Sequence, residues 1–250
     1  MSNPEQKSTS PQVNFGELKY WGFPLGELMI HFTHLSEDSY TRQGLSKARD
    51  LLQNRGLIIL DAHLTPLDII ATGIAVSENI ELEGCIVPVS TYDFYFPFFR
   101  KGFFGRINKM DGFELYPVCR VSDSKSWRHK FFFPQELTTR KKREAVLAYH
   151  RRTLEVIEEP HKVVLVAAYN GVNQLGNELA GGVERILESG CPALASLAVF
   201  DRELLRYKVF LSEDLLQFSQ VSQKDEMHTL IHSSHLRLLE KSRPQAPQEV

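Results

Sequence analysis

Short, nearly all-apolar runs alternate with longer amphipathic segments along most of the chain. Runs of this kind are more typical of buried strands than of helices, because a strand covered on both faces needs no polar alternation. The predicted strands are 57–62 (LIILDA), 84–91 (GCIVPVST), 113–120 (FELYPVCR), 162–169 (KVVLVAAY), 191–200 (CPALASLAVF) and 205–213 (LRYKVFLSE). The run 162–169 is the clearest of them, and 205–213 is predicted to be edge-like.

The segments between these runs place apolar residues at helical spacing. The predicted helices are 20–54, 66–77, 137–159 and 179–190, with stops at Gly56, Pro160 and Gly190. Strands that alternate with helices favour an α/β fold over an all-helical one. We therefore predict a layered, mostly parallel sheet flanked by helices.

A chain of 250 residues suits a single domain with a sizeable core. We interpret 14–240 as that domain, with a helical N-terminal part over 14–55 and an α/β core over 56–215. The polar, proline-bearing segments 1–13 and 241–250 are predicted to be disordered tails.

Composition and charge narrow the classes of function. The chain is 42% hydrophobic and 24% charged, with a net charge of −2, which gives no support for a nucleic-acid partner. The chain has three cysteines, far apart and in no CxxC pair, and this odd number without a cleavable apolar leader leads us to expect a reducing compartment. The cysteines show no metal-ligand spacing, so no metal is implied. No window of about 18 uncharged apolar residues exists, so we expect no transmembrane helix.

The stretch LDAHLTPLDII, residues 60–70, carries the candidate chemistry and has two interpretations. Thr65, Pro66 and Asp68 could form an ordinary helix start, with Thr65 as the N-cap. Alternatively, His63 and Asp68 could be a catalytic pair of the form H-x4-D, held together by the same turn. The two interpretations are compatible, because a helix start can position the aspartate and leave it free to hold the histidine.

A carboxylate on one imidazole nitrogen fixes the tautomer and makes the other nitrogen a better base. Such a base can deprotonate a hydroxyl that attacks a thioester or ester carbonyl, without a covalent enzyme intermediate. We therefore assign His63 as a candidate general base and Asp68 as the residue that orients it. No cofactor is implied by this chemistry.

The surroundings of this pair resemble the glycerophospholipid acyltransferases, the family that includes the 1-acylglycerol-3-phosphate acyltransferases. In that family an apolar strand ending in Asn-His-x4-Asp carries the catalytic residues, and this chain has Ala62-His63-LTPL-Asp68. The family's second block, a Gly before an apolar strand and an Arg, corresponds to 112–120, with Arg120 later than usual. The small-residue helix and the strand opening on Pro are kept at 179–200. The resemblance covers about 57–210 and implies the fold, the lipid substrates and the acyl transfer of that family.

The third family block, Phe-Pro-Glu-Gly-Thr-Arg, is degenerate in this chain. It falls on 168–173, where only Gly171 stands and Asn170 and Asn173 replace charged residues. In the family, that Arg and Glu are associated with binding the phosphate of the acceptor. We therefore expect either a neutral lipid alcohol, such as a diacylglycerol or a prenylated quinol, or a phosphate held by other cations. The candidate substrate-binding cations are Arg100, Lys101, Arg106 and Arg120. Asn170, Gly171 and Asn173 are also candidate substrate-binding residues, because backbone amides of this loop could bind a substrate or the developing oxyanion.

Two aromatic stretches bearing Lys and Arg, 91–106 and 128–134, could be core or membrane interface. The mixture of aromatic residues with Lys and Arg favours the membrane interface, where aromatic rings lie at headgroup depth and cations contact anionic lipid. We therefore expect peripheral association with the cytoplasmic side of a membrane.

Three functions remain open from the sequence. The first is an O-acyltransferase that takes its acyl group from acyl-CoA or acyl-carrier protein. The second is a non-catalytic lipid-binding or scaffold protein on the same fold. The third is a hydrolase in which water replaces the alcohol at His63.

Overall fold

The computed structural model describes residues 33–65, 67–90, 113–118, 139–169, 175–176, 178–180, 182–218 and 224–243. Strands and helices alternate along these residues, as the apolar runs predict. In chain order the elements are β1 (Thr33–Leu35), α3 (Ser39–Leu52), β2 (Leu57–Asp61), α4 (Asp68–Asn79), β3 (Gly84–Ser90), β4 (Phe113–Val118), α9 (Thr139–Val156), β5 (Lys162–Ala167), α10 (Val183–Leu187), β6 (Ala193–Asp201), β7 (Arg206–Leu216) and α11 (Lys224–Ser242).

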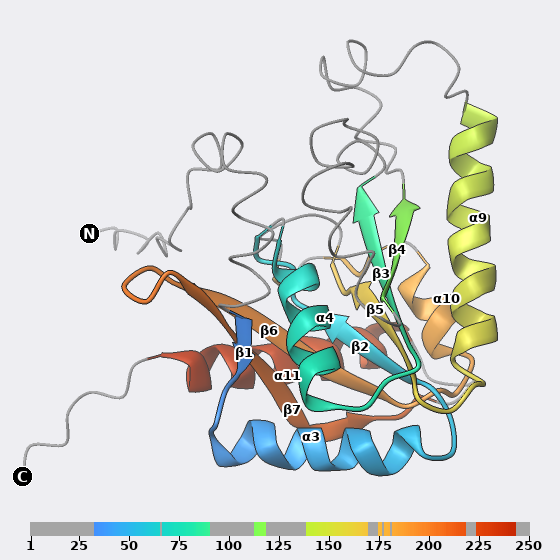
Figure 1. Cartoon of the computed structure of the whole chain (residues 1–250). Coiled ribbons are helices and arrows are strands. Elements are labelled where there is room, and N and C mark those ends of the chain that lie inside the picture. Colours follow the sequence, from blue (N-terminus) through green and yellow to red (C-terminus); the bar gives the residue numbers. More distant parts are fainter. Residues whose placement is uncertain are drawn as a thin grey trace, which may run out of the picture.

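The strands form one seven-stranded sheet in the order β1-β7-β6-β2-β5-β3-β4 (Figure 1). All neighbouring pairs are parallel except β6 and β7, which are antiparallel and joined by a hairpin turn. The prediction of an α/β fold with a mostly parallel sheet is therefore confirmed.

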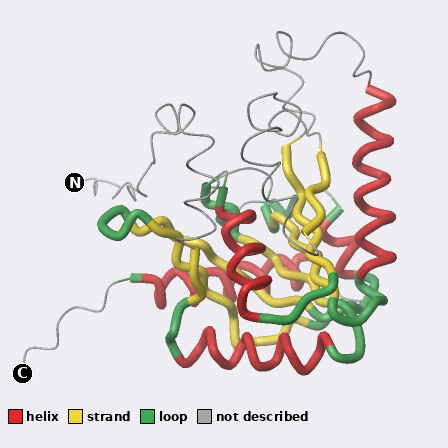
Figure 2. The backbone as a smooth tube through the Cα atoms, in the orientation of Figure 1, coloured by secondary structure: helices red, strands yellow, loops and turns green. Residues whose placement is uncertain are grey.

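Helices cover both faces of the sheet (Figure 2). Successive side chains of β2 point to opposite faces, so they pack against different helices. Leu57 and Ile59 belong to the core cluster that packs against α4 and α3. Ile58 and Leu60 belong to the cluster on the other face, which includes residues of α9, α10 and α11. Because both faces are covered, every residue of β2 is buried, which explains its continuous apolar run.

The chain leaves the carboxyl ends of β2 and β5 toward opposite faces of the sheet. After β2 it runs through α4 and continues to β3, whereas after β5 it runs through α10 and continues to β6. The core clusters place α4 on one face and α10 on the other. Open parallel sheets bind ligands where neighbouring connections diverge in this way. Residues 62–65, which follow β2, therefore lie at the expected position for a site.

Close backbone approach fixes the position of α3 on β7. A Cβ atom added at Gly44 in the middle of α3 would lie 2.2 Å from the main-chain oxygen of Ser212. Only glycine allows a helix and a strand to come this near at that point.

Two predicted boundaries and one predicted strand position are wrong. The predicted helix 20–54 includes Thr33–Leu35, which is strand β1, because Asp38 caps a new helix at Ser39. The predicted helix 179–190 is reduced to α10, because Gly182 has a φ of 95° and Leu179 and Ala180 are not helical. The strand predicted to be edge-like is β7, which lies between β1 and β6.

The C-terminal helix α11 extends into the segment 241–250 that is predicted to be a disordered tail. It ends at Ser242, so residues 241 and 242 belong to the helix rather than to the predicted tail. No helix in the described part of the chain is long and apolar enough to cross a membrane.

Candidate active site at the carboxyl end of β2

His63 lies two residues beyond the end of β2 and is almost completely buried, with 7% of its surface exposed. Its backbone has a φ of 51°, in the left-handed region that residues other than glycine adopt infrequently. Ala62, just before it, still donates its N–H to the main-chain oxygen of Ser196 on β6, at 3.0 Å. The chain therefore turns sharply away from the sheet at His63.

Asp68, the first residue of α4, holds the imidazole of His63. Its Oδ1 lies 2.9 Å from Nδ1 of His63, and the carboxylate is fully buried. The same carboxylate accepts the backbone N–H of Thr65 at 2.6 Å and that of Ile69 at 2.8 Å. Because an ionised carboxylate only accepts, Nδ1 carries the proton and Nε2 presents its lone pair. No hydrogen bond to Nε2 is found among the residues that the structure describes.

The local geometry reverses one predicted role. Thr65 is not the N-cap of α4, because the helix begins at Asp68 and its N-cap, Leu67, makes no side-chain cap bond. Instead the carboxylate of Asp68 accepts from the backbone of Thr65. The hydroxyl of Thr65 lies 3.2 Å from that of Tyr207 on β7, so the turn is also tied to the far strand.

Asp61 is a second buried acidic residue at this point, and it was not predicted from the sequence. Its Oδ1 accepts the backbone N–H of His63 at 2.9 Å. Its Oδ2 accepts the hydroxyls of Thr72 at 2.7 Å and Ser196 at 2.9 Å. Burial, followed by the nearby charge of Asp68, raises the pKa of Asp61 to about 7, while the hydrogen bonds from Thr72 and His63 oppose this shift. A single acidic residue inside the run LIILDA was the signal that could have identified it.

Asp61, His63 and Asp68 each place one possible metal-ligand atom within 4.8 Å of the other two. Their oxygen atoms, however, already accept five protein donors in addition to the imidazole. A cation at this point would compete with those hydrogen bonds. The geometry therefore suits an oriented base better than a metal centre.

A second buried pair connects α11 to the ends of β2 and β5. Nε2 of His235 lies 2.9 Å from the main-chain oxygen of Leu60, and its Nδ1 lies 2.9 Å from the hydroxyl of Tyr169. Burial lowers the pKa of His235 to about 4, so the ring is neutral near pH 7. Because the carbonyl of Leu60 can only accept, Nε2–H donates to it and the Tyr169 hydroxyl donates to Nδ1.

Of the residues predicted for the site, the structure brings His63 and Asp68 together. The other predicted residues, Arg100, Lys101, Arg106, Arg120, Asn170, Gly171 and Asn173, and both aromatic stretches lie outside the described residues. Tyr169, which directly precedes Asn170, lies beyond the end of β5, and the last residue of β5 pairs with Asp61. No protein-family model and no curated protein matches the chain.

Proposed function

We propose that this protein is an O-acyltransferase that moves a fatty acyl group from acyl-CoA or acyl-carrier protein to the hydroxyl of a lipid. The observation that supports this most is the buried contact of 2.9 Å between Nδ1 of His63 and Oδ1 of Asp68. It leaves Nε2 as the only ring nitrogen able to accept a proton. The position of His63 adds a second argument, because it lies at the carboxyl ends of the strands where neighbouring connections diverge, and open parallel sheets bind ligands there.

In the proposed reaction, Nε2 of His63 takes the proton of the lipid hydroxyl as its oxygen attacks the thioester carbonyl. Asp68 stabilises the imidazolium that forms, because its carboxylate faces Nδ1–H at 2.9 Å. The tetrahedral intermediate then expels the thiolate, which takes the proton back from Nε2. The products are the acylated lipid and the free thiol of the carrier, and His63 returns to its starting state.

The acceptor follows from the third block of the resemblance. Asn170 and Asn173 carry no charge, so a phosphate would need another cation, such as Arg120. A neutral lipid alcohol needs none. We therefore propose a neutral alcohol as the acceptor, with a phosphorylated acceptor held by Arg100, Lys101, Arg106 or Arg120 as the alternative.

The first experiment is acyl transfer from labelled acyl-CoA, and separately from labelled acyl-carrier protein, into a total lipid extract. We expect one labelled lipid with the wild type and at least a 1000-fold lower rate with His63→Ala, since the base is removed. Mass analysis of the product distinguishes a neutral lipid from a phospholipid. Release of labelled fatty acid in place of a lipid product would indicate the hydrolase.

His161→Ala is the matched control for this experiment. His161 also has a positive φ, 56°, but it lies directly before β5, at the amino ends of the parallel strands and therefore away from His63. The variant His161→Ala should therefore lose a similar amount of folding stability and keep the activity. A folded wild-type protein that binds lipid and transfers nothing from either donor would favour the non-catalytic scaffold.

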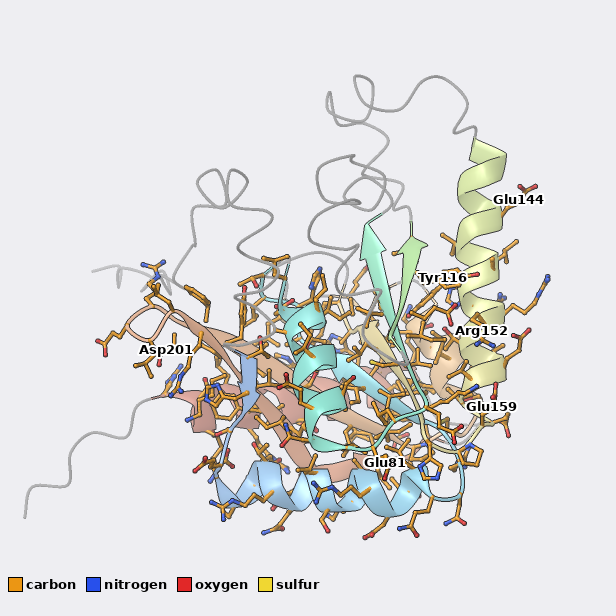
Figure 3. All side chains as sticks on the ribbon, viewed as in Figure 1. Glu81, Tyr116, Glu144, Arg152, Glu159 and Asp201 are labelled. Atoms are coloured by element: carbon orange, nitrogen blue, oxygen red, sulfur yellow. The ribbon has the colours of Figure 1, made fainter. Side chains whose placement is uncertain are left out.

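We further propose that the hairpin between β6 and β7 contacts the membrane surface. Leu204 and Leu205 at its tip are 50% and 58% exposed, and Arg206 and Lys208 follow on β7. β6 is parallel to β2 and continues past Ser196, the partner of Asp61, so the hairpin extends from the edge that carries His63. Asp201 marks its base in Figure 3. Exposed leucines beside cations suit the interface of an anionic bilayer.

Sedimentation with vesicles of anionic phospholipid tests this contact. Replacing both leucines together, Leu204→Ser and Leu205→Asn, should weaken binding about tenfold or more, since two buried leucines are lost. Asparagine is used at 205 because Leu205 has a φ of 49°, which asparagine tolerates. The control pair Leu147→Ser and Leu154→Asn removes two exposed leucines of α9, on the other side of the molecule in Figure 1. Equal binding by both double variants would contradict the assignment.

A further inference from the structure

We propose that Asp61 is a positioning residue, which holds the backbone of His63 in the conformation that presents Nε2 to the acceptor hydroxyl. This inference rests on the proposed function, in which His63 is the base. Asp61 touches neither substrate nor the imidazole ring in this role. It acts on the main chain of His63 through a single hydrogen bond of 2.9 Å.

The backbone at His63 needs such support. A φ of 51° is uncommon for a residue with a side chain, and it persists where the surroundings hold it in place. The Oδ1 atom of Asp61 accepts the N–H of the residue two positions later, which is the pattern of an Asx turn. This bond directs the chain out of β2 and sets the direction in which the imidazole leaves the main chain.

Asp61 is itself anchored on two elements. Thr72 of α4 and Ser196 of β6 both donate to its Oδ2. Thr72 lies four residues after Asp68 on the same helix, so the two residues share one helical face. Asp61 therefore fixes the backbone of His63 to the helix whose first residue holds the imidazole. Both the main chain and the ring of His63 are therefore held in place by hydrogen bonds that lead to α4.

Two other roles for Asp61 are distinguishable from positioning. The carboxylate could act through its charge on His63. Asp68 and Tyr207 are the other titratable groups close to Asp61. Asp61 could also contribute only to the stability of the core. The substitution Asp61→Asn separates position from charge, because the amide oxygen still accepts from His63 and the amide nitrogen can donate to the two hydroxyls. Asp61→Ala removes both.

The test compares kcat and KM of these two variants with the wild type, below the melting temperature of each. We expect kcat of Asp61→Ala to fall about 100-fold with KM nearly unchanged, because misplacing a catalytic group by about 1 Å costs that much. Asp61→Asn should stay within about fivefold of the wild type, since the turn is kept. An equal loss in both variants would assign the effect to charge and overturn the proposal. Wild-type kcat in folded Asp61→Ala would overturn it as well.

Nitrogen-15 NMR of the imidazole gives a readout that needs no substrate. The Nδ1–H resonance of His63, assigned by its loss in His63→Ala, reports the bond to Asp68. It should be retained in Asp61→Asn and lost or shifted in Asp61→Ala. If the wild type transfers no acyl group, this signal still decides whether Asp61 holds His63. A Nδ1–H signal unchanged in Asp61→Ala would contradict the inference even where kcat falls.

Two serine substitutions supply a matched comparison. Ser196→Ala removes one of the two hydroxyls on Asp61 and should lower kcat by about threefold to tenfold, as expected for a lost hydrogen bond to a carboxylate. Ser212→Ala removes a hydroxyl that is equally buried but bonds to the main chain at Ala195 and Asp214. It should leave kcat unchanged. The same loss of kcat in both serine variants would indicate a general effect on the sheet.

Discussion

Replacing Asp68 with asparagine is expected to lower kcat for the proposed acyl transfer by about 1000-fold to 10000-fold, although the two side chains have nearly the same shape. The carboxylate accepts at three points: from Nδ1–H of His63 and from the main-chain amides of Thr65 and Ile69. An asparagine has one oxygen and one NH2 group for these partners. Whichever way the amide turns, a backbone N–H or Nδ1 of His63 faces a donor.

The fall in rate follows from the tautomer of His63. If the NH2 group of the asparagine faces Nδ1, that nitrogen must accept, and the proton moves to Nε2. A protonated Nε2 cannot take the proton of a lipid hydroxyl. If the oxygen faces Nδ1 instead, the imidazolium loses the negative charge that stabilises it.

Asp38→Asn is the control for this substitution. Asp38 also accepts a helix-start amide, that of Thr41 in α3, at 2.9 Å, and asparagine caps helices about as well as aspartate. Both variants should fold, but only Asp68→Asn should lose activity. Steady-state rates with the labelled donor check this. Near-wild-type activity in Asp68→Asn would remove the histidine–aspartate pair from the mechanism.

The substitution Gly44→Ala is expected to destabilise the protein by more than about 2 kcal/mol, although alanine normally stabilises a helix relative to glycine by about 1 kcal/mol. The added Cβ would lie 2.2 Å from the main-chain oxygen of Ser212 and 3.0 Å from its carbonyl carbon. Neither atom belongs to a flexible side chain, so α3 or β7 must move. The packing cost therefore exceeds the gain in helix propensity.

Thermal and urea unfolding, followed by circular dichroism, measure this effect. Ser46→Ala, at an exposed position of the same helix, is the control and should be neutral or slightly stabilising. Increased stability in Gly44→Ala would show that α3 does not pack against β7 as closely as described.

The order of strands and helices was predictable because the apolar runs report burial on both faces of a sheet. The run at β2 is continuous for that reason, and so is the run at β5. The position of β7 was not predictable, since β1, the three-residue strand that covers it, carries no apolar run of its own. A short strand depends on its partner rather than on local propensity.

The pair His63 and Asp68 was predictable from spacing within one turn, because both residues are local in sequence. Asp61 was harder to identify, since its partners Thr72 and Ser196 come from a helix and a strand that only the fold brings together. His235 shows the same limit over a longer separation. Of its two partners, Leu60 is the last but one residue of β2 and Tyr169 lies two residues beyond the end of β5, and no sequence spacing connects them.

The link through His235 also bears on the order of events during synthesis. Leu60 directly precedes Asp61 in β2, yet the ring that donates to its carbonyl belongs to α11, the last helix described. Until α11 has left the ribosome, that buried carbonyl and the hydroxyl of Tyr169 lack their imidazole partner. The layer that supports His63 is therefore completed only after translation has passed α11, so a nascent chain that lacks this helix should not acquire the finished site.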